Sequence, residues 1–204
     1  MAKVDFKKTM KHLYHPPGKF GIVEVPEMQF VSIDGHGNPN TDQRYQDALE
    51  ALFAVAYKIK FISKKRLAKD YTVPPLEGLW WAENMDVFTA SPDKSQWDWT
   101  MMIMTPDWIT RAVFDDAVSQ VRSGKNPAAL DLVHWGKYCE GLAAQIMYIG
   151  AYTDEGPTIQ ALHEYITRQG YLLDGKHHEI YLGDPRRSAP EKLKTVIRQP
   201  IRPR

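Results

Sequence analysis

The stretch FVSIDGHGNPNTDQRYQDALEALFAVA, residues 30–56, decides the fold. It opens with an apolar strand pattern and continues into a loop rich in Gly, Asn and Pro. It ends with apolar residues at helical spacing, after a helix start signal at Thr41 and Asp42. A second stretch, IMYIGAYTDEGPTIQALHEYI (146–166), follows the same order. Self-similarity at about half the chain length predicts two related units.

Extended segments surround both stretches. In the first half, FGIVEVPEMQFVSIDGHG (20–37) reads as a strand, or as a strand pair broken near Pro26, and YTVPPLEGLWW (71–81) as extended structure. SPDKS (91–95) reads as a hairpin loop, and Thr105 with Pro106 as the start of another helix. In the second half, HHEIYL reads as a short strand, SAPE as a short helical turn, and KTVIRQPI as the closing strand.

This order predicts an α+β fold. Two duplicated βαββ units, related by a pseudo-twofold axis, would form one domain over residues 1–204, with halves of about 20–125 and 126–201. A fold of that kind leaves a central cleft between its halves. Clefts at such interfaces are common sites for small ligands.

The composition is that of an ordinary globular protein, with 43% hydrophobic and 25% charged residues among 204. A net charge of +1 gives no global field that would favour nucleic acid, and the basic C-terminal tail is interpreted as a solvated end. The single cysteine, Cys139, excludes an intrachain disulfide and is interpreted as a small buried hydrophobe. The start of the chain has no apolar signal-peptide segment, and its longest apolar run, GLAAQIMYIGAY, is too short to span a bilayer. We therefore expect a cytoplasmic protein without membrane or nucleic-acid partners, and the sequence leaves the oligomeric state open.

Glu179 is the first candidate for chemistry. Side chains alternate along a strand, so His177, Glu179 and Tyr181 share one face of HHEIYL. If that face meets solvent, the arrangement has no special meaning. If it lines the cleft, the carboxyl group lies among aromatic rings in a partly desolvated site, where it can act as a base, an acid or the partner of a cation.

The adjacent tryptophans Trp80 and Trp81 are the second candidate. They point to opposite faces of their strand, so one can pack into the core while the other lines a pocket. Gly78 leaves room beside Trp80, as it would where a ligand approaches the backbone closely. The alternative is one core residue and one that covers the surface. The sequence does not decide which tryptophan faces the cleft.

Several common sites have no support in the sequence. The histidines lack metal-ligand spacing, and there is no HExxH or CxxC motif. No GxGxxG begins a helix, and no phosphate loop or GxSxG motif is present. We therefore expect neither a metal nor a cofactor.

HHEIYLGDPRRSAPEKLKTVIRQPI (177–201), taken with YTVPPLEGLWW, resembles a known family. Together the two stretches are similar to the GyrI-like small-molecule-binding domain proteins of bacteria. Within that family the chain resembles a stand-alone branch, some of whose members are cyclopropanoid cyclopropyl hydrolases. The resemblance runs from about Phe20 to Ile201. It implies the fold expected above, with a cleft lined by aromatic rings around one buried glutamate.

The resemblance also implies a function. A flat aromatic small molecule would lie against the tryptophans, and water would be added to a strained cyclopropane ring, which would detoxify a genotoxin. The residues that this reading assigns are Glu179 and Tyr148 for catalysis, and Trp80, Trp81, Tyr71, Trp135 and Tyr181 for ligand binding. The alternative is a non-catalytic protein that sequesters drugs or toxins. A third possibility is an interaction with another protein, which would favour a large exposed patch over a dry pocket.

Overall fold

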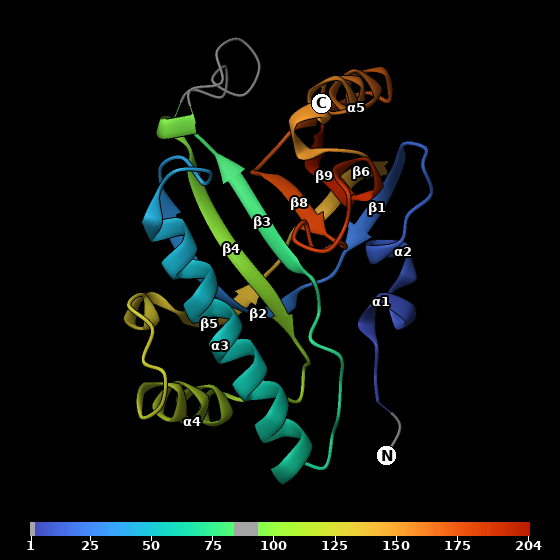
Figure 1. Ribbon diagram of the computed structural model, residues 1–204. Helices are drawn as coiled ribbons and strands as arrows, with labels where there is room; N and C mark the ends of the chain where they lie inside the picture. Colours follow the sequence, from blue (N-terminus) through green and yellow to red (C-terminus); the bar gives the residue numbers. More distant parts are fainter. Residues whose placement is uncertain (1–2, 84–93) are drawn as a thin grey trace.

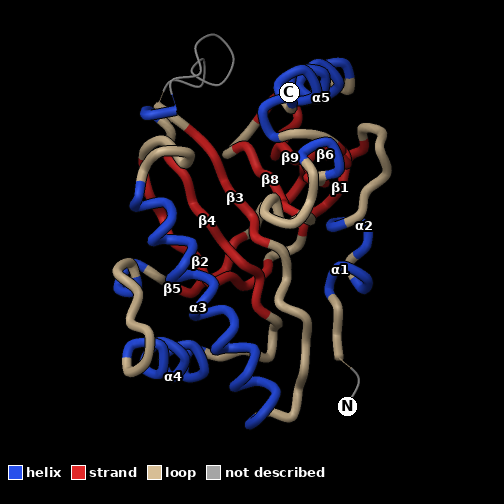
Figure 2. The backbone as a smooth tube through the Cα atoms, viewed as in Figure 1, coloured by secondary structure: helices blue, strands red, loops and turns tan. Residues whose placement is uncertain are grey.

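The computed structural model describes residues 3–83 and 94–204, and its described part is built on one large antiparallel sheet (Figures 1 and 2). The nine strands of this part are β1 (Gly21–Val25), β2 (Met28–His36), β3 (Leu76–Trp81), β4 (Asp98–Thr105), β5 (His134–Tyr138), β6 (Gly141–Ile149), β7 (Tyr171–Leu173), β8 (His177–Tyr181) and β9 (Lys194–Pro203). The α-helices are α1 (Phe6–Thr9), α2 (Lys11–Tyr14), α3 (Gln43–Arg66), α4 (Arg111–Arg122) and α5 (Gly156–Arg168). Short 3-10 turns are η2 (Lys94–Gln96), η3 (Leu130–Leu132), η4 (Tyr152–Asp154) and η5 (Pro190–Lys192).

The strand order is β1-β6-β9-β8-β3-β4-β2-β5, with β7 paired to β9. This arrangement confirms the predicted α+β class. The segments β2-α3-β3-β4 and β6-α5-β8-β9 are placed in the same order outward from the central β3–β8 pair. That order agrees with a duplicated plan, while the pseudo-twofold relation and the two sequence halves stay predictions.

Helices α3 and α5 lie on the same face of the sheet as Glu179 and leave its centre uncovered. Helix α3 packs on β2 and β4, and α5 packs on β6 and β7. Figure 1 shows β3 and β8 between these two helices. The opposite face is covered by the N-terminal helices, because Leu13 and Tyr14 of α2 pack against Ile180 of β8 and Val196 of β9. The two central strands therefore form the floor of an open space between α3 and α5.

The local sequence explains where α3 begins and which face it buries. Asp42 is its N-cap, and the Asp42 side chain accepts a hydrogen bond from the backbone N–H of Arg44. Leu52, Val55 and Ile59 are fully buried against the sheet. The spacing in the sequence predicted this helix and its buried side.

Helix α4 begins later than the sequence predicted. We expected Thr105 and Pro106 to open it, but the N-cap is Thr110. Thr105 is still part of β4, where it pairs with Gln29 of β2, so the chain must leave the sheet before a helix can form. A turn closed by the Ile109 N–H and the Pro106 carbonyl makes that transition.

Three further predictions concern Cys139, the hairpin loop at 91–95 and membrane-spanning segments. Cys139 is exposed just after the edge strand β5, so its interpretation as a buried hydrophobe was wrong. Most of the hairpin loop predicted at 91–95 lies outside the described residues. In residues 3–83 and 94–204, no helix is both long enough and apolar enough to cross a bilayer.

Candidate functional site

A cleft of about 2080 Å³ lies over the β3–β8 floor, between α3 and α5. Aromatic side chains from five parts of the chain form much of its wall: Tyr45, Trp80, Trp97, Tyr152 and Tyr181. Tyr45 comes from α3, Trp80 from β3 and Tyr181 from β8. The volume is larger than the ~300–1,000 Å³ of most small-molecule pockets, so a ligand of considerable size fits.

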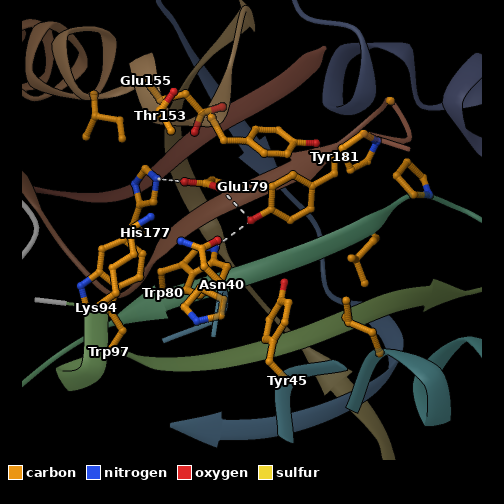
Figure 3. A pocket seen from close by; sticks show the side chains of 18 of the residues that line it. Asn40, Tyr45, Trp80, Lys94, Trp97, Thr153, Glu155, His177, Glu179 and Tyr181 are labelled. Carbon is orange, nitrogen blue, oxygen red and sulfur yellow. Dashed lines mark hydrogen bonds and ion pairs between the residues drawn. The ribbon is translucent and has the colours of Figure 1, made fainter. Parts of the chain in front are cut away.

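Glu179 is held in the cleft floor by two neighbours from its own strand (Figure 3). The Tyr181 hydroxyl donates to its Oε2 at 2.7 Å, and His177 Nε2 lies 3.2 Å from its Oε1. Burial alone would raise the pKa of Glu179, but the contacts with His177 and Tyr181 outweigh it and lower that pKa. Glu179 is therefore an ionised carboxylate in the cleft floor, with a side chain that is 15% exposed.

Trp80 is coupled to that carboxylate through Tyr181. The indole N–H of Trp80 donates to the Tyr181 hydroxyl at 3.0 Å, from the neighbouring strand. The ring of Trp80 lies over Gly78, where an added Cβ would be 2.8 Å from the indole nitrogen. The space above Gly78 is thus filled by Trp80 itself, which fixes the ring as part of the cleft wall.

Glu155, the residue before α5, also faces the cleft and behaves differently from Glu179. It is only 3% exposed, and its Oε1 has no hydrogen-bond partner among the described residues. Burial and the negative charge of Glu179 raise the pKa of Glu155 to about 9. At neutral pH Glu179 is therefore ionised while Glu155 keeps its proton, a pairing typical of sites that move protons.

The structure brings three of the predicted site residues together. Glu179, Tyr181 and Trp80 all line the cleft and form one hydrogen-bonded chain. Trp81 lies on the opposite face of the sheet, where it packs beside Leu79 and Met102 and carries the Lys176 ammonium over its ring. Of the adjacent tryptophans, Trp80 is the one that faces the cleft.

The other three predicted residues lie apart from the cleft. Tyr71 is buried and meets the rings of Phe6 and Trp108 edge to face. Trp135 donates its indole N–H to Thr105. Tyr148 donates its hydroxyl to the carbonyl of Ala151. None of the three is among the residues that line the cleft.

Sequence reasoning missed Tyr45, Lys94 and Glu155, which line the cleft, and assigned no specific site role to Trp97 and Tyr152, which line it too. In the sequence, Tyr45 is one of several apolar positions in a helical pattern, and Glu155 belongs to a polar loop. The signal for Glu155 was its place in the repeat, since it lies just before the helix of the second unit, as Asp42 does in the first. That correspondence gives the position of Glu155 in the fold, but it does not show that the Glu155 side chain points into the cleft.

Behind the floor, a second set of polar residues is fully buried. His178 lies between Glu77 (3.0 Å) and Glu140 (2.8 Å), and Glu140 also pairs with Arg198 at 3.0 Å. The Tyr14 hydroxyl of α2 donates to Glu77. His178 and Glu179 are neighbours on β8, so their side chains point to opposite faces of the sheet. The buried network therefore holds β8 on the face away from the cleft, while Glu179 points into the cleft.

No metal-type cluster is formed by the described residues, which offer no group of three His, Cys, Asp or Glu side chains placed to hold an ion. The predictions that the protein uses neither a metal nor a cofactor stay predictions.

Comparison with known proteins places the chain among small-molecule binders. A model of the GyrI-like small molecule binding domain matches residues 19–202. Three structures from Listeria innocua are similar over 98% of this chain and all of theirs: an uncharacterized conserved protein (38% identity, TM-score 0.90) and two proteins described as hydrolases (36% and 37% identity, TM-scores 0.86 and 0.88). The C-terminal domain of EcmrR shares the fold at 12% identity and a TM-score of 0.58, over 91% of this chain and 98% of its own. A search of curated proteins found no match.

Proposed function

The chain belongs to the GyrI-like small molecule binding domain family, and we propose that its cleft binds flat aromatic molecules and adds water to a strained cyclopropane ring within them. The observation that carries this proposal is the chain from Trp80 through Tyr181 to Glu179. It joins an aromatic wall to an ionised carboxylate in one rigid unit. A ligand stacked on the wall is thereby placed beside a base.

Binding would rest on the aromatic residues. Trp80, Trp97 and Tyr45 approach one another with centroid distances of 5.6 Å (Trp80–Trp97) and 6.3 Å (Tyr45–Trp80). Each aromatic contact with a flat ligand contributes about 0.5–1.5 kcal/mol beyond the burial of surface. Trp80 and Trp97 meet edge to face and Tyr45 is tilted against Trp80, so a flat ligand would meet one ring face on and others edge on.

Glu179 would act as the general base. Each carboxylate oxygen of Glu179 accepts one hydrogen bond and can accept another from a water molecule. In the step proposed, the water oxygen forms a bond to a ring methylene carbon, and a ring C–C bond breaks. The released electron pair moves into a conjugated carbonyl of the ligand, while the proton of the water passes to Glu179.

Glu155 would complete the proton balance. The carbonyl oxygen of the ligand gains negative charge as the ring opens and takes up a proton. Glu155 keeps its proton at neutral pH and faces the same cleft, so it is the matching acid. Ring strain already makes the electrophile reactive, and holding water and carbon in line supplies much of the remaining acceleration.

Two Listeria innocua relatives are described as hydrolases, which supports catalysis over binding alone. Opening the ring removes an alkylating group, so we propose a detoxifying role in the cytoplasm. The alternative is a protein that binds the same molecules and sequesters them without turnover. The same residues serve both functions, and only product formation separates them.

The test is incubation with a cyclopropane-bearing, DNA-alkylating aromatic compound, followed by mass spectrometry. Wild type and the exposed control Glu191→Gln should both yield a product heavier by one water molecule, and Glu179→Gln should not. Equal conversion by Glu179→Gln would remove that residue from the centre of the mechanism. Ligand-dependent quenching of tryptophan fluorescence without any conversion would establish the sequestering alternative.

A further inference from the structure

Lys94 lies in the same cleft as the carboxyl groups and has no role in the chemistry described above. It belongs to η2 and lines the cleft beside Trp97. Its ammonium lies over the Trp97 ring, 5.0 Å from the ring centroid. An ammonium at that distance makes a cation–π contact, the interaction by which aromatic clefts hold cationic ligands.

We propose that Lys94 determines the charge of the ligand, so that the cleft selects neutral flat molecules over cationic ones. This inference rests on the proposed function only in taking the cleft as the ligand site. It concerns which ligand charge is accepted and not whether the ligand is hydrolysed.

The first support is that groups of the protein already occupy the two partners that a cationic ligand would need, an aromatic ring and a carboxylate. The Lys94 ammonium occupies a position over Trp97, and the Glu179 carboxylate is already engaged by His177 and Tyr181. A ligand cation would have to displace Lys94 or lie close to it. Like charges in a partly desolvated site repel more strongly than in water.

The second support is the balance of charge inside the cleft. Charged residues near its rim form pairs, Lys125 with Glu50 at 2.6 Å and Arg186 with Asp184 at 3.0 Å. Asp174, which also lines the cleft, is exposed to solvent.

Farther in, the ionised carboxylate of Glu179 is opposed by the ammonium of Lys94, while Glu155 keeps its proton. Burial and His177 lower the pKa of His163 to about 4, so its ring is uncharged at neutral pH. Whether His177 is neutral or protonated, these interior groups carry no net negative charge. A cation therefore gains no overall attraction from these interior groups of the described residues.

The charge of Lys94 also influences the two carboxyl groups, as expected if all three groups face the same cleft. After burial and the contacts that each group makes with its neighbours, the charge of Lys94 is a further influence that lowers the pKa of both Glu155 and Glu179. Lys94 therefore acts on the same space as the two carboxyl groups. A variant without this charge leaves Glu179 as the dominant charge of the interior.

The test uses two probes of nearly the same shape: phenanthridine, measured at a mildly alkaline pH where it is uncharged, and N-methylphenanthridinium, which is a permanent cation. Binding of each to the intact chain is measured by calorimetry. Wild type should bind the neutral probe about tenfold more tightly. Lys94→Met should abolish or reverse that preference, because the opposing charge is gone while the length of the side chain is kept.

Two further variants serve as controls. Lys94→Arg keeps the positive charge and should keep the preference, and Lys125→Met removes a lysine that is paired at the rim and should leave the ratio unchanged. The proposal is overturned if wild type binds the cation at least as tightly as the neutral probe, if neither probe binds, or if Lys94→Met leaves the ratio of affinities as it was. The ratio does not depend on turnover, so an absence of hydrolysis with the ratio intact would count against the proposed function alone.

Discussion

Trp80 and Tyr181 are joined across the central β3–β8 pair by a hydrogen bond of 3.0 Å from the indole N–H to the phenol oxygen. The same phenol donates to Glu179 at 2.7 Å. A residue that shapes the wall and a residue that carries charge are therefore coupled through one hydroxyl group. The position of the tryptophan ring and the basicity of the carboxylate depend on each other.

Gly78→Ala tests how tightly the wall is fixed. The new Cβ would be 2.8 Å from the Trp80 indole nitrogen and 3.2 Å from the sulfur of Met101, so the indole must shift and its hydrogen bond to Tyr181 must weaken. We expect aromatic ligands to bind about tenfold more weakly, as measured by fluorescence titration. Gly136→Ala is the matched control, because an added Cβ in β5 meets no atom within 4 Å and the affinity should not change.

The adjacent tryptophans allow a paired comparison. Trp80→Phe removes part of the cleft wall and the donor to Tyr181, and should weaken ligand binding by about tenfold. Trp81→Phe changes the opposite face of the sheet and should lower the thermal midpoint while leaving affinity unchanged. Calorimetric titration and thermal unfolding of both variants give the two readouts. Equal losses of affinity would contradict the assignment of Trp80 alone to the cleft.

Tyr181→Phe tests the control of the carboxylate. The contacts from His177 and Tyr181 lower the pKa of Glu179 against the effect of burial, so removing the hydroxyl should raise that pKa. A base must be ionised to act, and the acidic limb of the pH–rate profile should therefore move upward by about one pH unit. Tyr165→Phe, on α5 and outside the cleft lining, should leave the limb in place.

The sequence predicted the floor of the cleft better than its walls. Alternation along β8 placed His177, Glu179 and Tyr181 on one face, because a period of two is fixed by strand geometry. The same rule put Trp80 and Trp81 on opposite faces. It could not say which face lies between the helices, since that depends on how α3 and α5 pack over the sheet.

The walls come from segments whose approach is set by tertiary packing. Glu155 and Tyr45 lie more than a hundred residues apart in the chain, and no local pattern marks them as neighbours of one cleft. Tyr148 and Trp135 were assigned by position in strands, but the assignment depends on which way each side chain points. The N-terminal helices were missed because each spans only four residues, too few for periodicity to appear.

The buried network behind the floor predicts how stability changes with pH. Burial alone would lower the pKa of His178, but Glu140 and Glu77 outweigh it and raise that pKa from 6.5 to about 9. A histidine whose pKa is raised on folding contributes its full stabilisation below pH 6.5, and that contribution is lost as the pH rises through about 9. The thermal midpoint should therefore fall across this alkaline range.

His178→Gln should lower stability at neutral pH and flatten that alkaline decline, because the titrating group is gone. His134→Gln, which removes an exposed histidine of β5, is the control and should retain the decline. Scanning calorimetry at a series of pH values provides the measurement. An unchanged alkaline decline in His178→Gln would show that other groups cause it.

The central claim is that Glu179 directs water to a strained ring in an aromatic cleft. Its most direct test is single-turnover reaction in water enriched in heavy oxygen, with the product analysed by mass spectrometry for wild type and Glu179→Gln. We predict one labelled oxygen on the opened ring carbon, formed at least about a hundredfold faster by wild type. Equal rates for the two proteins, or a product without the label, would contradict the account.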